Sequence, residues 1–257
     1  MKWHEPVAGF KYDTATVVIS SDFQRDKLAA CGLDTEVFKG SVDPSFFIGE
    51  AIHAGVNSGI SAQGNVNMLQ TLTQHRPAGL EEPLTVRGGI VSVTEVPRGR
   101  TIDTEVVFES ASGERVITAN RRSLKPDPEK AGERGAGDRP APVVTDLAQL
   151  RVVAEHVLTP EIVKAYSREG NSIHYELEAA RAAGFRAPLI GGGMGVHYLL
   201  AYLWQAHQPT ILDLDIYFRR PIFWDESFVV AVSPGLDAIC LAKDGKVATE
   251  ARIKVLE

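Results

Sequence analysis

The order of predicted elements repeats once along the 257-residue chain, and this repeat constrains the fold more than any other feature. In each half, the pattern predicts a long apolar helix followed by a series of strands. Pro44 stands before the first long helix, and Arg76-Pro77 follows the next strand. Pro188 and Arg220-Pro221 occupy the matching places, each 144 residues later. Such self-similarity predicts two copies of one α+β unit, each with a long helix and a mostly antiparallel sheet.

A polar segment separates the two halves. Residues 125–142 contain four prolines, three glycines and eight charged residues, and alanines are their only apolar side chains. Because such a segment has little apolar surface to bury, we expect an exposed linker. The expected organisation is an N-terminal unit at residues 1–124, the linker at 125–142, and a C-terminal unit at 143–257.

Turn signals and β-branched runs define the expected elements of each unit. We expect strands at residues 14–20, 66–74, 84–96, 100–110, 114–121, 152–158, 212–218, 227–232, 238–242 and 246–255. We expect helices at residues 24–30, 44–60, 175–183 and 192–205, and a further helix that starts at Thr159-Pro160.

Composition excludes several classes of protein. The chain is 44% hydrophobic with a formal net charge of −6, and it has neither a dense basic cluster nor eighteen consecutive apolar residues. We therefore expect no nucleic-acid partner and no membrane span. Its two cysteines form no CxxC pair, and the first residues form no apolar signal segment, so we expect a cytoplasmic protein without disulfides.

The densest cluster of reactive residue types lies just before the helix expected at 175–183. In a turn, the carboxylate of Glu169, the amide of Asn171 and the imidazole of His174 can converge on one water molecule. One titratable group would take a proton and the other would deliver one, while the amide holds the water. The alternative is structural: Asn171 only caps the helix, Glu169 is solvated, and His174 is a half-buried surface residue.

A run of glycines opens the longest apolar helix. Glycines at Gly191, Gly192 and Gly193 leave backbone N–H groups bare at a helix N-terminus, where the helix dipole adds positive potential. This end could hold a phosphate or the oxygen of a polarised carbonyl, and the missing Lys-Ser/Thr of a P-loop favours the carbonyl. Alternatively, the glycines only permit close packing of the helix against a sheet.

Other candidates are weaker. We expect His197 to be packed in the core or to cap a helix. No HxxxH or CxxC spacing supports a metal site, and no GxSxG supports a serine hydrolase.

The cluster and the glycine run together resemble a known family. Glu169-Gly170-Asn171-Ser172-Ile173-His174 is followed at the expected spacing by Gly184-Phe185-Arg186-Ala187-Pro188 and Gly192, and later by Tyr217-Phe218-Arg219-Arg220-Pro221. This order is similar to the motif of the MaoC-like dehydratases, or (R)-specific enoyl-CoA hydratases (hydratase 2). The match is strongest over residues 152–227. The resemblance implies a double hot-dog fold, in which a sheet wraps each long helix.

The resemblance also implies a reaction. Family members add water to a trans-2-enoyl thioester of CoA or dehydrate an (R)-3-hydroxyacyl thioester. Glu169 and His174 stand where the family has its acid–base pair, Asn171 matches its Asn, and the Gly192 N–H would polarise the thioester carbonyl. The remaining expected substrate-binding residues are Tyr166, Ser172 and Gly193. We expect no metal and no cofactor, because CoA is only the substrate's carrier.

Two departures from the family motif leave alternatives open. Glu169 replaces Asp, which places the carboxylate one methylene farther from the backbone, and Ser172 replaces Pro. Such displacements can cost orders of magnitude in rate. A hot-dog thioesterase and a degenerate subunit that only binds acyl thioesters are therefore the alternative functions. The carrier is CoA or acyl carrier protein, and the assembly is a monomer or a homodimer.

The first half carries no second site. No histidine lies between His4 and His53, where an Asn-x-x-His would have to stand. By analogy, Phe46, Phe47 and Ile48 either line space for an acyl chain or belong to the core.

Overall fold

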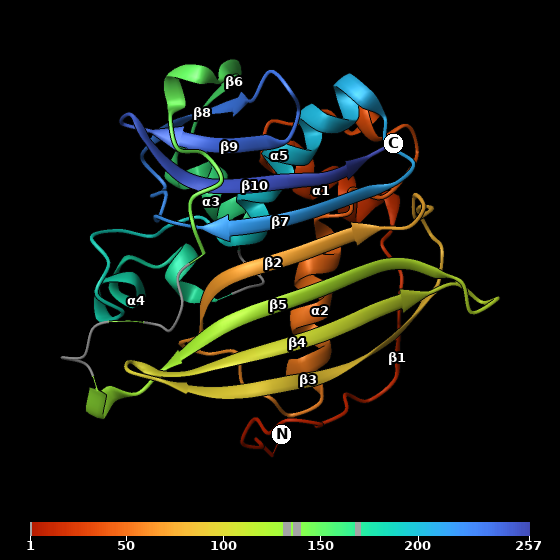
Figure 1. The fold of residues 1–257 in the computed structure, drawn as a ribbon, viewed down its shortest axis with the longest axis vertical. Coiled ribbons are helices and arrows are strands. Elements are labelled where there is room, and N and C mark those ends of the chain that lie inside the picture. Colours follow the sequence, from red (N-terminus) through yellow and green to blue (C-terminus); the bar gives the residue numbers. More distant parts are fainter. Residues whose placement is uncertain (1, 131–134, 136–139, 168–170) are drawn as a thin grey trace.

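Ten strands form one antiparallel sheet, and the long helices lie against one of its faces (Figure 1). The computed structural model describes residues 2–130, 135, 140–167 and 171–257. Its strands are β1 (Ala15–Val17), β2 (Val66–Gln74), β3 (Leu84–Val96), β4 (Gly99–Glu109), β5 (Arg115–Pro126), β6 (Arg151–Val157), β7 (Leu212–Phe218), β8 (Ser227–Val232), β9 (Ala238–Lys243) and β10 (Lys246–Leu256). Its α-helices are α1 (Ser21–Ala30), α2 (Phe46–Asn57), α3 (Pro160–Ser167), α4 (Leu177–Ala182) and α5 (Gly192–His207). Short 3₁₀ helices are η1 (Thr35–Phe38), η2 (Pro128–Lys130), η3 (Leu147–Gln149) and η4 (Ser172–His174).

The two halves of the chain place their corresponding strands in mirrored order across the sheet. Its strands run β1-β3-β4-β5-β2-β7-β10-β9-β8-β6, so each strand of the first half has a counterpart at the mirrored place in the second. The two halves meet where β2 pairs with β7, in register from Leu69↔Tyr217 to Gln74↔Leu212. The predicted α+β class is confirmed by this arrangement.

One hydrophobic core spans both halves on the helix side of the sheet. Helix α2 contributes Phe46, Phe47 and Ile48, which are 7%, 1% and 2% exposed. Phe47 packs edge-on against Phe108 of β4, with ring centroids 4.8 Å apart. These three residues therefore belong to the core, which was one of the two alternatives expected for them.

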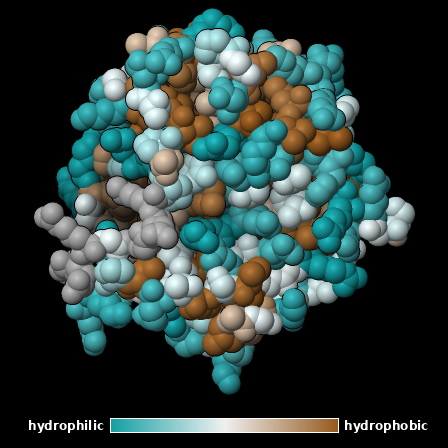
Figure 2. Space-filling model, viewed as in Figure 1, coloured by the Kyte–Doolittle hydropathy of each residue, from teal (hydrophilic) through white to brown (hydrophobic). Residues whose placement is uncertain are grey.

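The opposite face of the sheet is crossed by the segment that joins the halves. Val144 is buried there against β8 and β9, and its N–H donates to Glu250 Oε2 at 2.8 Å. Arg219 pairs with the other oxygen of the same buried carboxylate at 2.7 Å. Elsewhere hydrophilic residues cover most of this face, with hydrophobic residues in separate patches (Figure 2).

Strand β5 is longer than expected. It continues through Lys125 and Pro126, where Pro126 is the register partner of Gly99. A proline is tolerated at the end of a strand because no further ladder N–H is needed there. Of the rest of the expected linker, residues 131–134 and 136–139 lie outside the described residues.

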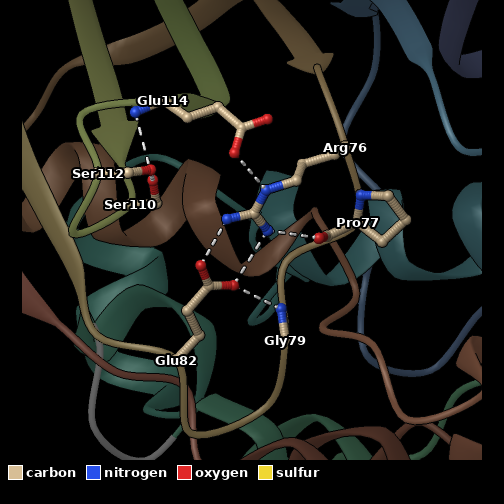
Figure 3. Close-up of polar contacts among 7 residues, drawn as sticks. All are labelled: Arg76, Pro77, Gly79, Glu82, Ser110, Ser112 and Glu114. Atoms are coloured by element: carbon tan, nitrogen blue, oxygen red, sulfur yellow. Dashed lines mark hydrogen bonds and ion pairs between the residues drawn. The ribbon is translucent and has the colours of Figure 1, made fainter.

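The repeated Arg-Pro landmarks follow β2 and β7, but the two arginines make different contacts. Arg76 donates to Glu82 at 2.6 Å and to Glu114 at 3.2 Å, and it also reaches the carbonyl of Pro77 (Figure 3). Arg220 instead donates to the backbone carbonyl of Val247 at 2.7 Å. The Arg-Pro pair thus follows the strand in both halves, but its arginine has different hydrogen-bond partners in each half.

Helix lengths also bear on membrane insertion. Within the described ranges, no helix is both long enough and apolar enough to cross a bilayer.

Candidate active site at the N-terminus of α5

The N-terminus of α5 leaves its first N–H groups unused. Gly191 is the N-cap in an extended conformation, and no side chain caps the helix. The first N–H to find a partner there is that of Gly195, which donates to Gly191 O at 3.3 Å. The described part of the chain offers no acceptor to the N–H groups of Gly192, Gly193 and Met194. These donors and the helix dipole make a site for an oxygen that carries negative charge.

At Gly192, an aromatic ring approaches the backbone too closely for a Cβ, while Gly191 has an imidazole at ordinary contact distance. A Cβ added to Gly192 would lie 2.8 Å from the ring of Phe218, at the end of β7. A Cβ added to Gly191 would lie 3.5 Å from His174 Nε2. The glycine run therefore brings an aromatic ring and an imidazole to the open helix end.

His174 is held in a defined orientation beside that end. Its Nδ1 lies 2.7 Å from Leu189 O, and because a carbonyl only accepts, Nδ1 carries the proton. Nε2, the ring atom nearest Gly191, then carries the lone pair. Burial lowers the pKa of His174 from its usual 6.5, which favours the neutral ring. This imidazole can therefore accept a proton at neutral pH.

The other members of the predicted cluster have separate places. Asn171 is exposed and caps η4, where its side-chain oxygen accepts from the N–H of Ile173 at 3.3 Å. Ser172 starts η4, and its carbonyl accepts from the N–H of Tyr175 at 3.0 Å. Glu169 lies outside the described residues. Of the three expected catalytic groups, His174 is thus the one found beside α5, and the roles of Glu169 and Asn171 stay predictions.

Tyr166 brings a second hydrogen-bonding group to the glycine run. Its hydroxyl lies 3.9 Å from the position of a Cβ added to Gly193. The same hydroxyl lies 2.7 Å from His197 Nε2. Burial raises the pKa of Tyr166 well above its usual value, so the phenol keeps its proton. Lys27 of α1 holds the backbone of Tyr166 by donating to its carbonyl oxygen at 2.8 Å.

His197 connects Tyr166 to the first half of the chain. Its Nδ1 lies 2.7 Å from Asp43 Oδ2 and 2.6 Å from Ser45 Oγ. Because a carboxylate only accepts, Nδ1–H donates to Asp43, and the Tyr166 hydroxyl can donate to Nε2. His197 and Asp43 are fully buried, and Ser45 is 1% exposed. Burying these polar groups is tolerable because each has a partner.

Sequence reasoning missed this network. His197 is a packed residue, as expected, but its hydrogen-bonding role was not foreseen. Asp43 and Ser45 flank a proline just before α2, which is a typical helix-start signal and says nothing of a distant partner. The 154 positions between Asp43 and His197 leave no local pattern to find.

Across the described ranges, no group of three or more His, Cys, Asp or Glu side chains is placed to hold a metal ion.

Comparison with solved structures identifies proteins that share this fold. No protein-family model and no curated protein sequence matches the chain. A solved MaoC-like dehydratase from Phytophthora capsici superposes with a TM-score of 0.76 at 17% identity, covering 98% of each chain. HtdX from Mycobacterium tuberculosis gives a TM-score of 0.73 at 18% identity, covering 95% of this chain and 99% of that one.

A third similar structure is the full-length peroxisomal multifunctional enzyme type 2 from Drosophila melanogaster. It gives a TM-score of 0.69 at 17% identity, and the match covers 95% of this chain and 48% of that one. The sequence resemblance to the MaoC-like and hydratase 2 group is thus matched in three dimensions, and the chain has the hot-dog fold.

Proposed function

We propose that the chain is a hydro-lyase that adds water to a trans-2-enoyl thioester, or removes it from an (R)-3-hydroxyacyl thioester. One observation carries the proposal: the neutral His174 side chain stands beside a helix end whose first N–H groups have no acceptor among the described residues. A base next to preorganised donors is the combination that hydration of a conjugated thioester requires. The fold shared with a MaoC-like dehydratase adds support.

In the proposed reaction, the thioester oxygen accepts hydrogen bonds at the N-terminus of α5, from Gly192 and Gly193. This polarises the double bond and makes C3 electrophilic. Water forms a bond to C3 and gives up one proton to a base, while the π electrons move toward the carbonyl oxygen as an enolate. A proton is then delivered to C2, and the carbonyl is restored. The donors are worth most for the enolate, where negative charge has developed.

Each predicted site residue has a place in this scheme. The lone pair on His174 Nε2 is suited to take or return a proton, and Glu169 is proposed as its acid–base partner. Asn171 would hold the water, and Ser172 would contact the substrate from the same turn. Tyr166 would support the carbonyl end beside Gly193. The addition of water is neither oxidation nor reduction, so the scheme needs no redox cofactor.

The two halves are proposed to be tandem hot-dog units, at residues 1–124 and 143–257. The mirrored strand order supports this proposal, because it relates β2 to β7 and β5 to β10. The first unit would lack a catalytic motif. CoA or acyl carrier protein as the carrier, a monomer or a homodimer, and a cytoplasmic location stay predictions.

The test is a panel of trans-2-enoyl-CoAs of increasing chain length, followed by loss of enoyl-thioester absorbance. We expect hydration by the wild type and a loss of roughly 10²–10⁴-fold in His174→Ala. His53→Ala is the matched control, because His53 lies on α2 with 62% of its side chain exposed. Release of free CoA without hydration would instead indicate a thioesterase, and binding without turnover would indicate a degenerate subunit.

A further inference from the structure

A hollow with unused hydrogen-bond donors lies in the first half of the molecule, between α2 and strands β4 and β5. It has about 30 Å³ of internal space and opens partly to solvent. One water needs roughly 10–15 Å³ of such space, so the hollow takes about two waters or a group of that size. Alanine and isoleucine side chains of α2 and β4 form part of its wall.

Arg121 supplies a cation to this hollow from β5. Its Nε donates to Asn67 Oδ1 at 2.5 Å, and the phenol of Tyr12 lines the same hollow. Across the described ranges, no carboxylate forms an ion pair with Arg121. Burial lowers the pKa of Arg121 to about 10, so the guanidinium stays charged at neutral pH. A shielded cation without a counter-charge is costly, and an anionic ligand would offset that cost.

Three hydroxyl groups line the same hollow. They belong to Tyr12, Thr104 of β4 and Ser123 of β5, and within the described residues none of them forms a hydrogen bond. Ser123 is 2% exposed, so its hydroxyl has little access to bulk water. Burial raises the pKa of Tyr12 to about 12, and its phenol therefore remains a donor. Because none of these oxygens is among the fully buried side-chain atoms without a partner, they are accessible from the hollow, where a ligand or ordered water can accept from them.

The hollow has a further unpaired group at its rim. Asn65 has a buried side-chain oxygen that finds no partner among the described residues. A half-turn of the amide would present its NH₂ group there instead, because the two ends of an amide have the same shape. Five groups from separate parts of the first half can thus donate toward one small space.

We propose that this hollow binds a carboxylate group. A guanidinium matches the planar, two-oxygen shape of a carboxylate, and hydroxyl donors can satisfy the remaining lone pairs. The carboxylate could belong to a free organic acid or to the far end of a dicarboxylic acyl thioester. The second source rests on the proposed hydro-lyase function.

The sheet places the hollow within reach of the candidate active site. Arg121 is paired with Gln70 of β2, and Gln70 is paired with Ile216 of β7. Cross-strand partners share a face of the sheet, and two strand spacings amount to about 10 Å. Phe218, two residues beyond Ile216 on the same face, is the residue that packs against Gly192. An extended acyl chain could span this separation.

The first experiment measures binding of free ligands by calorimetry. Hexanoate and its neutral analogue hexanamide differ only in the group that the hollow would recognise. We expect the wild type to bind hexanoate about tenfold more tightly or better, as charge-assisted hydrogen bonds allow. Arg121→Met should remove the difference, and Arg121→Lys should retain part of it.

Gly55→Ala tests the space separately from the charge. A Cβ at Gly55 would lie 3.1 Å from the Tyr12 hydroxyl, so this variant narrows the hollow and leaves Arg121 in place. We expect weaker hexanoate binding with an unchanged circular dichroism spectrum. An affinity equal to that of the wild type would contradict the assignment of the ligand to this hollow.

The second experiment distinguishes the two sources of the carboxylate. Hydration rates are compared for an eight-carbon 2-enoyl-CoA that ends in a carboxylate and one that ends in a methyl group. A preference for the carboxylate form that Arg121→Met abolishes assigns the hollow to the substrate's end. Hexanoate binding without any hydration would leave the hollow intact and overturn the proposed function. Equal binding of hexanoate and hexanamide, with no preference between the thioesters, would overturn the carboxylate site.

Discussion

The N-termini of α2 and α5 stand at matching places in the two halves, yet they differ in whether their first N–H groups have hydrogen-bond acceptors. The first three N–H groups of α2 donate to backbone carbonyls one turn earlier, at 3.1–3.2 Å. The carboxylate of Asp43 also accepts from the N–H and the hydroxyl of Ser45 there. At α5, glycines stand in these places and the first N–H groups find no partner in the described part of the chain. The comparison teaches that one architecture can use a helix end for stability in one half and leave it available for a ligand in the other.

The largest expected effect comes from removing the buried carboxylate at the N-terminus of α2. Asp43→Ala would leave His197 and Ser45 without their buried acceptor, and we expect a loss of about 3 kcal/mol or more in the free energy of unfolding. Urea denaturation measures the loss. Asp26→Ala, at a side chain that is 75% exposed, is the control and should change stability by less than about 0.5 kcal/mol. A similar stability in the two variants would show that the buried network is not what holds α2 in place.

The role of the N-terminus of α5 is tested by adding a side-chain atom there. In Gly192→Ala, the added Cβ would meet Phe218 at 2.8 Å and push the helix end away from its position. We expect kcat/KM for an enoyl-CoA to fall by about tenfold or more, because misplacement on this scale weakens carbonyl polarisation.

Gly49→Ala provides the matched control in the other helix. Nothing lies within 4 Å of a Cβ at Gly49, so activity should be unchanged and stability should rise by about 0.5–1 kcal/mol. Equal kinetic constants for Gly192→Ala and the wild type would remove the helix end from the proposed mechanism.

A smaller effect is expected at the Arg-Pro landmark of the first half. Arg76→Ala removes the contacts to Glu82 and Glu114 drawn in Figure 3. About 30% of the Arg76 side chain is exposed, so we expect a loss of about 1 kcal/mol or less in thermal unfolding. A loss above about 3 kcal/mol would show that this loop, and not the β2–β7 seam alone, holds the first half together.

The smallest effect concerns pH. Because burial lowers the pKa of His174, the unfolded chain binds its proton more readily, and stability from this residue is lost as pH falls below about 6.5. The stability difference between the wild type and His174→Gln should therefore shrink or reverse from pH 7.5 to pH 5.5. Other histidines are common to both proteins and cancel. A difference that grows at low pH would indicate a raised pKa and a charged imidazole.

Much of the architecture could be predicted because its signals are local. Strands β2 and β3 begin and end at the expected residues, where turn residues follow alternating apolar positions. Strand β5 was expected to end at residue 121, but its pairing with β4 continues to Pro126, which stands at the last paired position. Local propensity describes where an element can stop, but pairing with Gly99 decides where it does.

The candidate site was predictable to a lesser extent. The position of His174 beside the glycine run followed from the resemblance to the MaoC-like motif, whose residues can be read from the sequence. The link from Tyr166 through His197 to Asp43 could not be, because it depends on how the two halves pack. Arg121 gave no signal either, since a strand arginine is normally expected to face solvent and this one points toward a helix.

The seam between β2 and β7 has a consequence for how the two halves are joined. Thr71 and Thr73 of β2 donate to Asp215 and Asp213 of β7, at 2.9 and 3.1 Å, and Lys254 pairs with both carboxylates. The halves thus adhere through this sheet interface as well as through the hydrophobic core that they share on the helix side of the sheet. The covalent connection then acts mainly by raising the effective concentration of one half near the other. We expect the two halves, expressed as separate polypeptides, to assemble into the same structure by fragment complementation.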